Sequence, residues 1–142
     1  MVIADTGFWL ALANRRDKYH AIAGASLAAL DEPLITTWPV LTETCHLLLQ
    51  HLGNPAQQKL IKAYSTGAFD VFDLTRDHTS GIHKFMKKYA DLPMDLADAS
   101  LIILAEHLGH GRILSTDQRD FRTYRWKQRK PFENLMLSKQ AV

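Results

Sequence analysis

The sequence predicts an α/β fold in which parallel strands alternate with helices. Short aliphatic and aromatic runs recur along the chain, longer stretches with helical periodicity separate them, and Pro and Gly stand where helices should begin and end. With 142 residues, of which 46% are hydrophobic, the chain has the size and balance of one globular domain. We expect a single domain over residues 1–137 and a short tail over 138–142.

The expected strands and helices follow one another in order. The strands are the runs Val2–Ala4, Leu34–Thr36, Phe69–Leu74, Arg112–Ser115 and Asn134–Leu137. Helices are expected to begin near Phe8, to cover Tyr19–Leu30, Val40–Leu52, Ala56–Ser65 and Leu96–Leu104, and to include Phe121. Crossover helices make successive strands parallel. Their carboxyl ends then share one edge of the sheet, where α/β folds build their sites.

Prolines and glycines delimit several of these helices. Pro39 and Pro55 suit a first helical turn, where the missing N–H of proline costs nothing. Gly53, Gly67 and Gly109 stand at helix ends, where glycine readily adopts a positive φ. The positions of these prolines and glycines agree with the helix boundaries predicted from the apolar pattern.

Two carboxylates are expected at the carboxyl edge of the sheet. Asp5 ends the first strand, and Asp117 follows the strand that contains Ile113. Each could instead cap the helix that begins after it. Asp120 could take the place of Asp117 in a site. We favour Asp117 as the direct contributor and Asp120 as its support.

Two further acids lie on helices at positions where burial is expected. Glu43 shares the apolar face of its helix with Val40, and Asp98 interrupts the apolar helix Leu96–Leu104. Glu43 could simply be a first-turn carboxylate that interacts with the helix dipole. Asp98 could form a capping box with Asp95. The alternative is that both acids point into a functional site.

Four carboxylates in one crevice require a counter-charge. Two carboxylates about 4 Å apart repel by about 4 kcal/mol at an effective dielectric constant near 20. A divalent cation with oxygen ligands, Mg²⁺ or Mn²⁺, offsets that repulsion. Cys45 is the only cysteine, which excludes a Cys-rich zinc site and an internal disulfide.

These segments resemble PIN-domain ribonucleases, in particular VapC-type toxins of prokaryotic toxin–antitoxin pairs. The matching pieces are Asp5-Thr6-Gly7, Glu43, Leu96-Ala97-Asp98-Ala99 and Ser115-Thr116-Asp117 with Asp120-Phe121. The resemblance implies a three-layer α/β/α fold with a parallel sheet of about five strands. It also implies a Mg²⁺- or Mn²⁺-dependent endoribonuclease with Asp5, Glu43, Asp98 and Asp117 as the acidic quartet, metal held chiefly by Asp5 and Asp98, and Thr6 and Thr116 as polar neighbours.

The same resemblance implies an RNA substrate, an antitoxin partner and a homodimer. Lys and Arg exceed Asp and Glu by 17 − 15 = 2, but six cations and one acid fall between Arg119 and Lys130. This stretch also contains Tyr124 and Trp126, a composition suited to phosphate contacts and base stacking. We expect RNA contacts from Arg119, Arg122, Arg125 and Lys127. A solvated loop is the alternative.

No apolar run is long enough to span a membrane, and we expect a cytoplasmic protein. Two other functions are compatible with the same residues. A catalytically silent PIN-like RNA-binding module would lack affinity for Mg²⁺ or Mn²⁺. A metal-dependent phosphatase or receiver-like domain would act on small phosphoesters but not on RNA.

Overall fold

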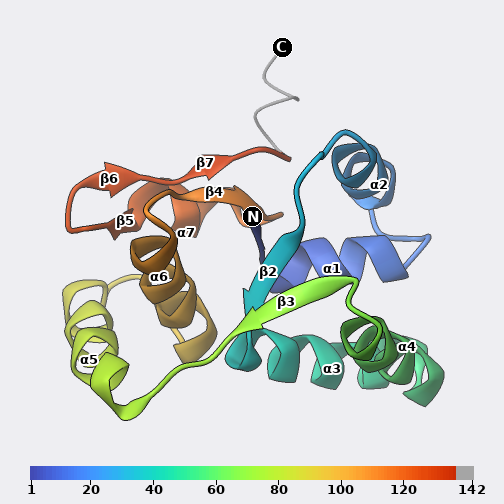
Figure 1. Cartoon of the computed structure of the whole chain (residues 1–142), viewed down its shortest axis with the longest axis horizontal. Helices are drawn as coiled ribbons and strands as arrows, with labels where there is room; N and C mark the ends of the chain where they lie inside the picture. The colour runs from blue at the N-terminus through green and yellow to red at the C-terminus, as the bar shows by residue number, and fades with distance from the viewer. Residues whose placement is uncertain (137–142) are drawn as a thin grey trace.

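Five parallel strands form one sheet in the order β3-β2-β1-β4-β7 (Figure 1). The computed structural model describes residues 1–136, without the side chains of Gln118 and Arg119, so the expected tail and Leu137 lie outside the described part. The strands are β1 (Val2–Ala4), β2 (Leu34–Thr37), β3 (Phe69–Phe72), β4 (Arg112–Leu114) and β7 (Glu133–Asn134). The predicted α/β fold with a parallel sheet of about five strands is confirmed.

Helices cover both faces of the sheet (Figure 1). The chain steps outward from β1 to β2 and β3, and then returns to β4 on the other side of β1. Right-handed crossovers therefore place the helices of the outward and return paths on opposite faces. The first set is α1 (Thr6–Ala13), α2 (His20–Ala28), α3 (Trp38–Leu52) and α4 (Asn54–Ser65). The second is the 3₁₀ turn η1 (Arg76–His78), α5 (Thr79–Lys88) and α6 (Leu96–Leu108), with the short helix α7 (Gln118–Thr123) after β4.

The hydrophobic core lies where β1 and α6 meet. All three residues of β1 are buried, and α6 is buried continuously from Ala99 to Ala105. Trp9 of α1 is also buried in this core. Each buried Leu or Ile contributes about 1.5–3 kcal/mol. This packing holds the first turn of α6 rigidly beside the carboxyl ends of the strands.

The basic stretch after α7, for which a solvated loop was the alternative to an RNA contact, contains a small antiparallel hairpin. Its strands are β5 (Arg125–Trp126) and β6 (Lys130–Pro131), and its turn uses positive φ at Lys127 (46°) and Gln128 (68°). Hairpin turns of this kind normally carry Asn or Gly, so the sequence did not indicate one here.

No helix within residues 1–136 is both long and apolar enough to cross a membrane.

Candidate active site

The carboxyl ends of β1 and β4 define the candidate site. These neighbouring strands are the point at which the chain reverses its direction across the sheet, and open α/β sheets bind ligands in the crevice outside such a point. Asp5 follows β1, and its backbone N–H donates to the Leu114 carbonyl of β4 at 3.1 Å. The loop after β4 leads to Asp117. Both predicted strand-end acids therefore lie at this crevice.

Asp5 is buried and held at both carboxylate oxygens. Oδ1 accepts a hydrogen bond from the Thr6 N–H at 2.7 Å, as expected of the residue that caps α1, and Oδ2 accepts from the Ser115 hydroxyl at 2.9 Å. Burial, with smaller contributions from the nearby charges of Asp117 and Glu43, raises the pKa of Asp5 to about 6 against the opposing hydrogen bonds from Thr6 and Ser115. The capping role and a place in the acidic cluster are both realised.

Asp98 joins the cluster from the first turn of α6. It forms the expected capping box with Asp95, whose Oδ1 accepts from the Asp98 N–H at 2.8 Å. The Tyr124 hydroxyl donates to Asp98 Oδ2 at 3.4 Å. Burial, followed by the charges of Asp95 and Asp5, raises the pKa of Asp98 to about 8. The capping box thus positions Asp98 beside Asp5 without removing it from the crevice.

Glu43 and Asp117 complete the neighbourhood. Burial and the charge of Asp95 raise the pKa of Glu43, which also interacts with the Thr6 side chain. Asp117 caps α7 by accepting from the Asp120 N–H at 3.0 Å. The charges of Glu43 and Asp117 act on Asp5, and those of Asp5 and Asp120 act on Asp98, so Asp5 is the acid that links the predicted cluster.

The loop after β4 is fixed by residues that sequence analysis did not single out as supports. Besides contacting Asp5, the Ser115 hydroxyl accepts from the Asp117 N–H at 2.9 Å, and it therefore ties two of the four acids together. The Asn134 side chain clamps Ser115 by donating to its carbonyl at 2.8 Å and accepting from its N–H at 3.3 Å. The Thr116 hydroxyl lies 1.9 Å from where a Cβ on Gly7 would stand. Any side chain at residue 7 would therefore force the Thr116 side chain to move.

The donor chemistry fits a magnesium-type cation that keeps part of its water shell. Within residues 1–136, no three His, Cys, Asp or Glu side chains are gathered closely enough to hold a metal by themselves. Mg²⁺ commonly binds through only one or two carboxylates plus waters. Asp5 and Asp98 offer two such oxygen donors. Their raised pKa values reflect burial and neighbouring negative charge, the situation that a cation relieves.

The predicted RNA-contacting cations have different surroundings. Arg122 and Lys127 are exposed, whereas the side chain of Arg119 lies outside the described part. Arg125 Nη1 donates to the carbonyl of Arg122 at 2.6 Å, and this hydrogen bond caps the C-terminal turn of α7. The two aromatic residues proposed for base stacking, Tyr124 and Trp126, are 0% and 7% exposed, and that part of the prediction is wrong. Their rings pack in the core.

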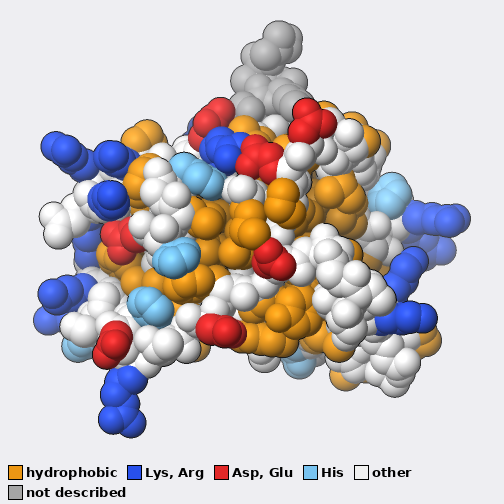
Figure 2. Space-filling model, in the orientation of Figure 1, with side chains coloured by type: hydrophobic (Ala, Val, Ile, Leu, Met, Phe, Trp, Pro, Cys, Tyr) orange, Lys and Arg blue, Asp and Glu red, His pale blue; other side chains and the backbone are white. Residues whose placement is uncertain are grey.

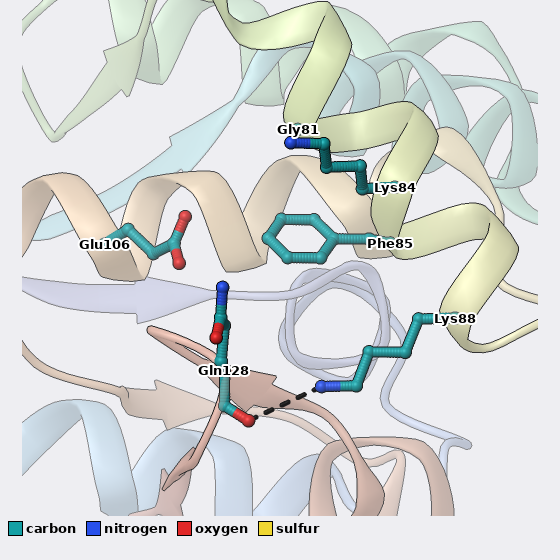
Figure 3. Close-up of a pocket in the computed structure, with 6 residues that line it drawn as sticks. All are labelled: Gly81, Lys84, Phe85, Lys88, Glu106 and Gln128. Carbon is teal, nitrogen blue, oxygen red and sulfur yellow. Dashed lines mark hydrogen bonds between the residues drawn. The ribbon is translucent and has the colours of Figure 1, made fainter.

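A cavity of about 610 Å³ lies between α5 and the hairpin (Figure 3). Lys84 and Lys88 of α5 line it together with Gln128, whose carbonyl oxygen accepts from Lys88 Nζ at 3.4 Å. In Figure 2, one group of Lys and Arg side chains lies on the left side of the molecule, where Figure 1 shows α5 and the hairpin, and a second group lies on the right. The fold therefore adds cations to the basic segment from a helix some 40 residues earlier, which sequence analysis missed.

Comparison with known proteins agrees with this architecture. The PIN domain family model matches residues 2–127. The chain is similar to Ribonuclease VapC26 of Mycobacterium tuberculosis (strain ATCC 25618 / H37Rv), with 23% identity over 124 residues that cover 87% of this chain and 92% of the relative. Its fold is similar to the crystal structure of Mycobacterium tuberculosis VapC20, a sarcin–ricin loop cleaving toxin, with a TM-score of 0.78, 22% identity, and coverage of 84% and 92%. The chain belongs to the PIN-domain family and is distantly homologous to the VapC ribonuclease toxins.

Proposed function

We propose that this protein is a Mg²⁺- or Mn²⁺-dependent endoribonuclease and the toxin of a type II toxin–antitoxin pair. The observation that carries the proposal is the meeting of Asp5, Glu43, Asp98 and Asp117 at the carboxyl ends of β1 and β4, with the pKa of three of them raised. Membership of the PIN family and similarity to VapC toxins support the choice of RNA as substrate.

The residues of the site divide into two roles. Asp5 and Asp98 would hold the cation, which when bound stabilises negative charge on the phosphate and lowers the pKa of a bound water. Glu43 would orient the attacking water, and its raised pKa makes its carboxylate a better proton acceptor than an ordinary glutamate. Asp117, which follows β4, is the alternative residue for this task.

The neighbouring side chains hold these acids in place. Ser115 fixes Asp5 and the Asp117 backbone, and the Tyr124 hydroxyl fixes Asp98. Thr6 and Thr116 supply polar groups beside the acids, and Asp120 supports Asp117. Such outer contacts typically change metal affinity or activity 10- to 100-fold when removed.

Basic residues outside the crevice would bring RNA to it. Arg122, Arg125 and Lys127 of the basic segment, with Lys84 and Lys88 of α5, offer phosphate contacts that the acidic crevice lacks. By the same homology we propose an antitoxin partner, a homodimer and a cytoplasmic location.

The test is RNA cleavage by the purified protein with Mn²⁺, followed by sequencing of the new RNA ends. Asp5→Asn and Asp98→Asn should abolish cleavage while the fold is retained, because each removes charge with little change in volume. Asp91→Asn, an exposed acid close to α6, is the matched control and should cleave normally. Undiminished cleavage by both site variants would refute the mechanism.

The same preparation separates the rival functions. RNA binding without cleavage, together with no affinity for Mg²⁺ or Mn²⁺, would favour a silent binding module. Turnover of small phosphoesters without RNA cleavage would favour a phosphatase or a receiver-like domain.

A further inference from the structure

Trp38 is the exposed tryptophan of this protein. The three tryptophans all lie in the described part of the chain, and Trp9 and Trp126 are each 7% exposed whereas Trp38 is 43% exposed. A large exposed apolar side chain is by itself ordinary. What distinguishes Trp38 is that its ring is held in place although it faces solvent.

Two contacts orient the Trp38 ring. Its Nε1–H donates to Asp73 Oδ1 at 3.2 Å, just after β3. Its ring meets Tyr64 of α4 edge-on, with ring centroids 5.5 Å apart and planes at 83°. These contacts reduce the freedom of the side chain before any ligand arrives, which lowers the entropic cost of binding a partner on its exposed surface.

Trp38 lies at the same edge of the sheet as the acidic site. Trp38 opens α3 directly after Thr37, the last residue of β2, and α3 also carries Glu43. The Thr37 and Ser100 hydroxyls are 2.6 Å apart, and Ser100 lies two residues after Asp98 on α6. Strand β2 is the neighbour of β1, about 4.8 Å away. Trp38 therefore lies at the carboxyl edge of the sheet, on the β2 and β3 side of the crevice, with its ring between Asp73 and Tyr64.

The chemistry of this position favours a base over a phosphate. The hydrogen-bond partner of the ring is the carboxylate of Asp73, so a phosphate here would meet negative charge. A nucleobase is neutral and offers a π face that stacks on an aromatic ring without sequence preference. A single-stranded nucleotide next to the bond being cleaved has such a base exposed.

We propose that Trp38 is a base-stacking platform for the nucleotide beside the scissile phosphate. This inference rests on the proposed ribonuclease function and gives that site a preference for unpaired RNA. Trp38 supplies an exposed aromatic side chain, whereas Tyr124 and Trp126 of the basic segment are buried.

The first test is tryptophan fluorescence of the full chain with a single-stranded oligouridylate at low salt, in EDTA so that no cleavage occurs. Saturable quenching should occur with the oligonucleotide and be lost in Trp38→Ala, and an oligomer of the same length with abasic positions should not quench. Affinity measured by fluorescence anisotropy of a labelled oligouridylate should fall about 5- to 150-fold in Trp38→Ala and stay close to wild type in Trp38→Phe. Leu49→Ala, which removes another exposed apolar side chain from α3, is the control.

The second test is steady-state cleavage of single-stranded RNA with Mn²⁺. Trp38→Ala should raise KM with little change in kcat, and Trp38→Phe should restore KM. Unchanged affinity and KM in Trp38→Ala, or equal quenching by the abasic oligomer, would overturn the proposal. So would a change in oligomeric state of Trp38→Ala, because Trp38 would then be a subunit contact. Base-dependent quenching without any cleavage would uphold stacking and refute the ribonuclease.

Discussion

The two edges of the same sheet treat acidic side chains in opposite ways. At the amino edge, Glu32 precedes β2 and pairs with the Met1 ammonium group at 2.9 Å and with both terminal nitrogens of Arg112, the first residue of β4. These cations lower the pKa of Glu32 to about 2. At the carboxyl edge, burial and neighbouring acids raise the pKa of Asp5 and Asp98.

The contrast separates an acid that stabilises the fold from acids that prepare a site. The Glu32 pairs join the starts of β1, β2 and β4, so its charge is already balanced within the chain. Burial and neighbouring carboxylates raise the pKa values of Asp5 and Asp98. A bound cation would offset the negative charge and lower both pKa values. Perturbed carboxylates in a crevice are typical of functional sites.

The largest difference between the edges should appear in catalysis. Asp98→Asn should abolish Mn²⁺-dependent RNA cleavage, a loss of at least about 100-fold, because several kcal/mol of transition-state stabilisation depend on the cation. Glu32→Gln should leave cleavage unchanged. Initial rates on one labelled RNA measure both. A similar loss in the two variants would erase the functional contrast.

A smaller loss should follow from removing a support of the carboxyl edge. Ser115→Ala deletes the hydroxyl that joins Asp5 to the Asp117 backbone, and cleavage should fall about 10- to 100-fold with the fold intact. Ser65→Ala removes an exposed hydroxyl from α4 and serves as the control. Normal cleavage by Ser115→Ala would show that Asp5 needs no such support.

The contributions of the two edges to the free energy of unfolding should change with pH in opposite directions. Aspartates in the unfolded chain titrate near pH 3.9, whereas the pKa values of Asp5 and Asp98 are raised to about 6 and about 8. Between these values the folded state binds more protons. The free energy of unfolding of the metal-free protein should therefore fall as pH rises from about 4 to about 8. Thermal melts in EDTA measure this fall, which Asp98→Asn should flatten and Mg²⁺ at pH 8 should offset. A metal-free protein that gains stability over this range would contradict the assignment.

The smallest effect is expected at the amino edge. Because the pKa of Glu32 is lowered, its contribution to stability is present above about pH 4.5 and is lost as pH falls through about 2. Glu32→Gln should lower the melting temperature by a few degrees at most at pH 7, since the pairs are partly exposed. The difference from wild type should vanish near pH 2. A difference that persists there would mean that packing, not charge, explains it.

Local patterns were enough to predict the sheet, the buried helix α6 and the neighbourhoods of the four acids. Strand ends and helix faces are properties of adjacent residues, so Asp5 and Asp98 could be located from their immediate surroundings. The contact from Ser115 to Asp5 joins residues 110 positions apart, and no local pattern encodes it. Strand β3 ends at Phe72 and not at Leu74 as expected, because Asp73 leaves the sheet and accepts a hydrogen bond from the Trp38 indole N–H.

The hairpin and the contribution of Lys84 and Lys88 to the basic surface could not be predicted from the sequence, for different reasons. The hairpin turn places Lys127 and Gln128 at positive φ, against the preference of those residues, so tertiary contacts decide it. One such contact is the Lys127 N–H, which donates to Glu106 Oε2 of α6 at 2.8 Å. Lys84 and Lys88 join the surface only after α5 packs beside the hairpin. The domain end at residue 137 stays a prediction.

The most direct test of the contrast is a Mn²⁺ titration of wild type, Asp98→Asn and Glu32→Gln. Electron paramagnetic resonance of the free ion measures how much Mn²⁺ each protein binds. Wild type and Glu32→Gln should bind Mn²⁺ with the same affinity, and Asp98→Asn should bind it at least about tenfold more weakly. Equal binding by all three proteins, or loss of binding in Glu32→Gln alone, would contradict the assignment of the metal site to the carboxyl edge of the sheet.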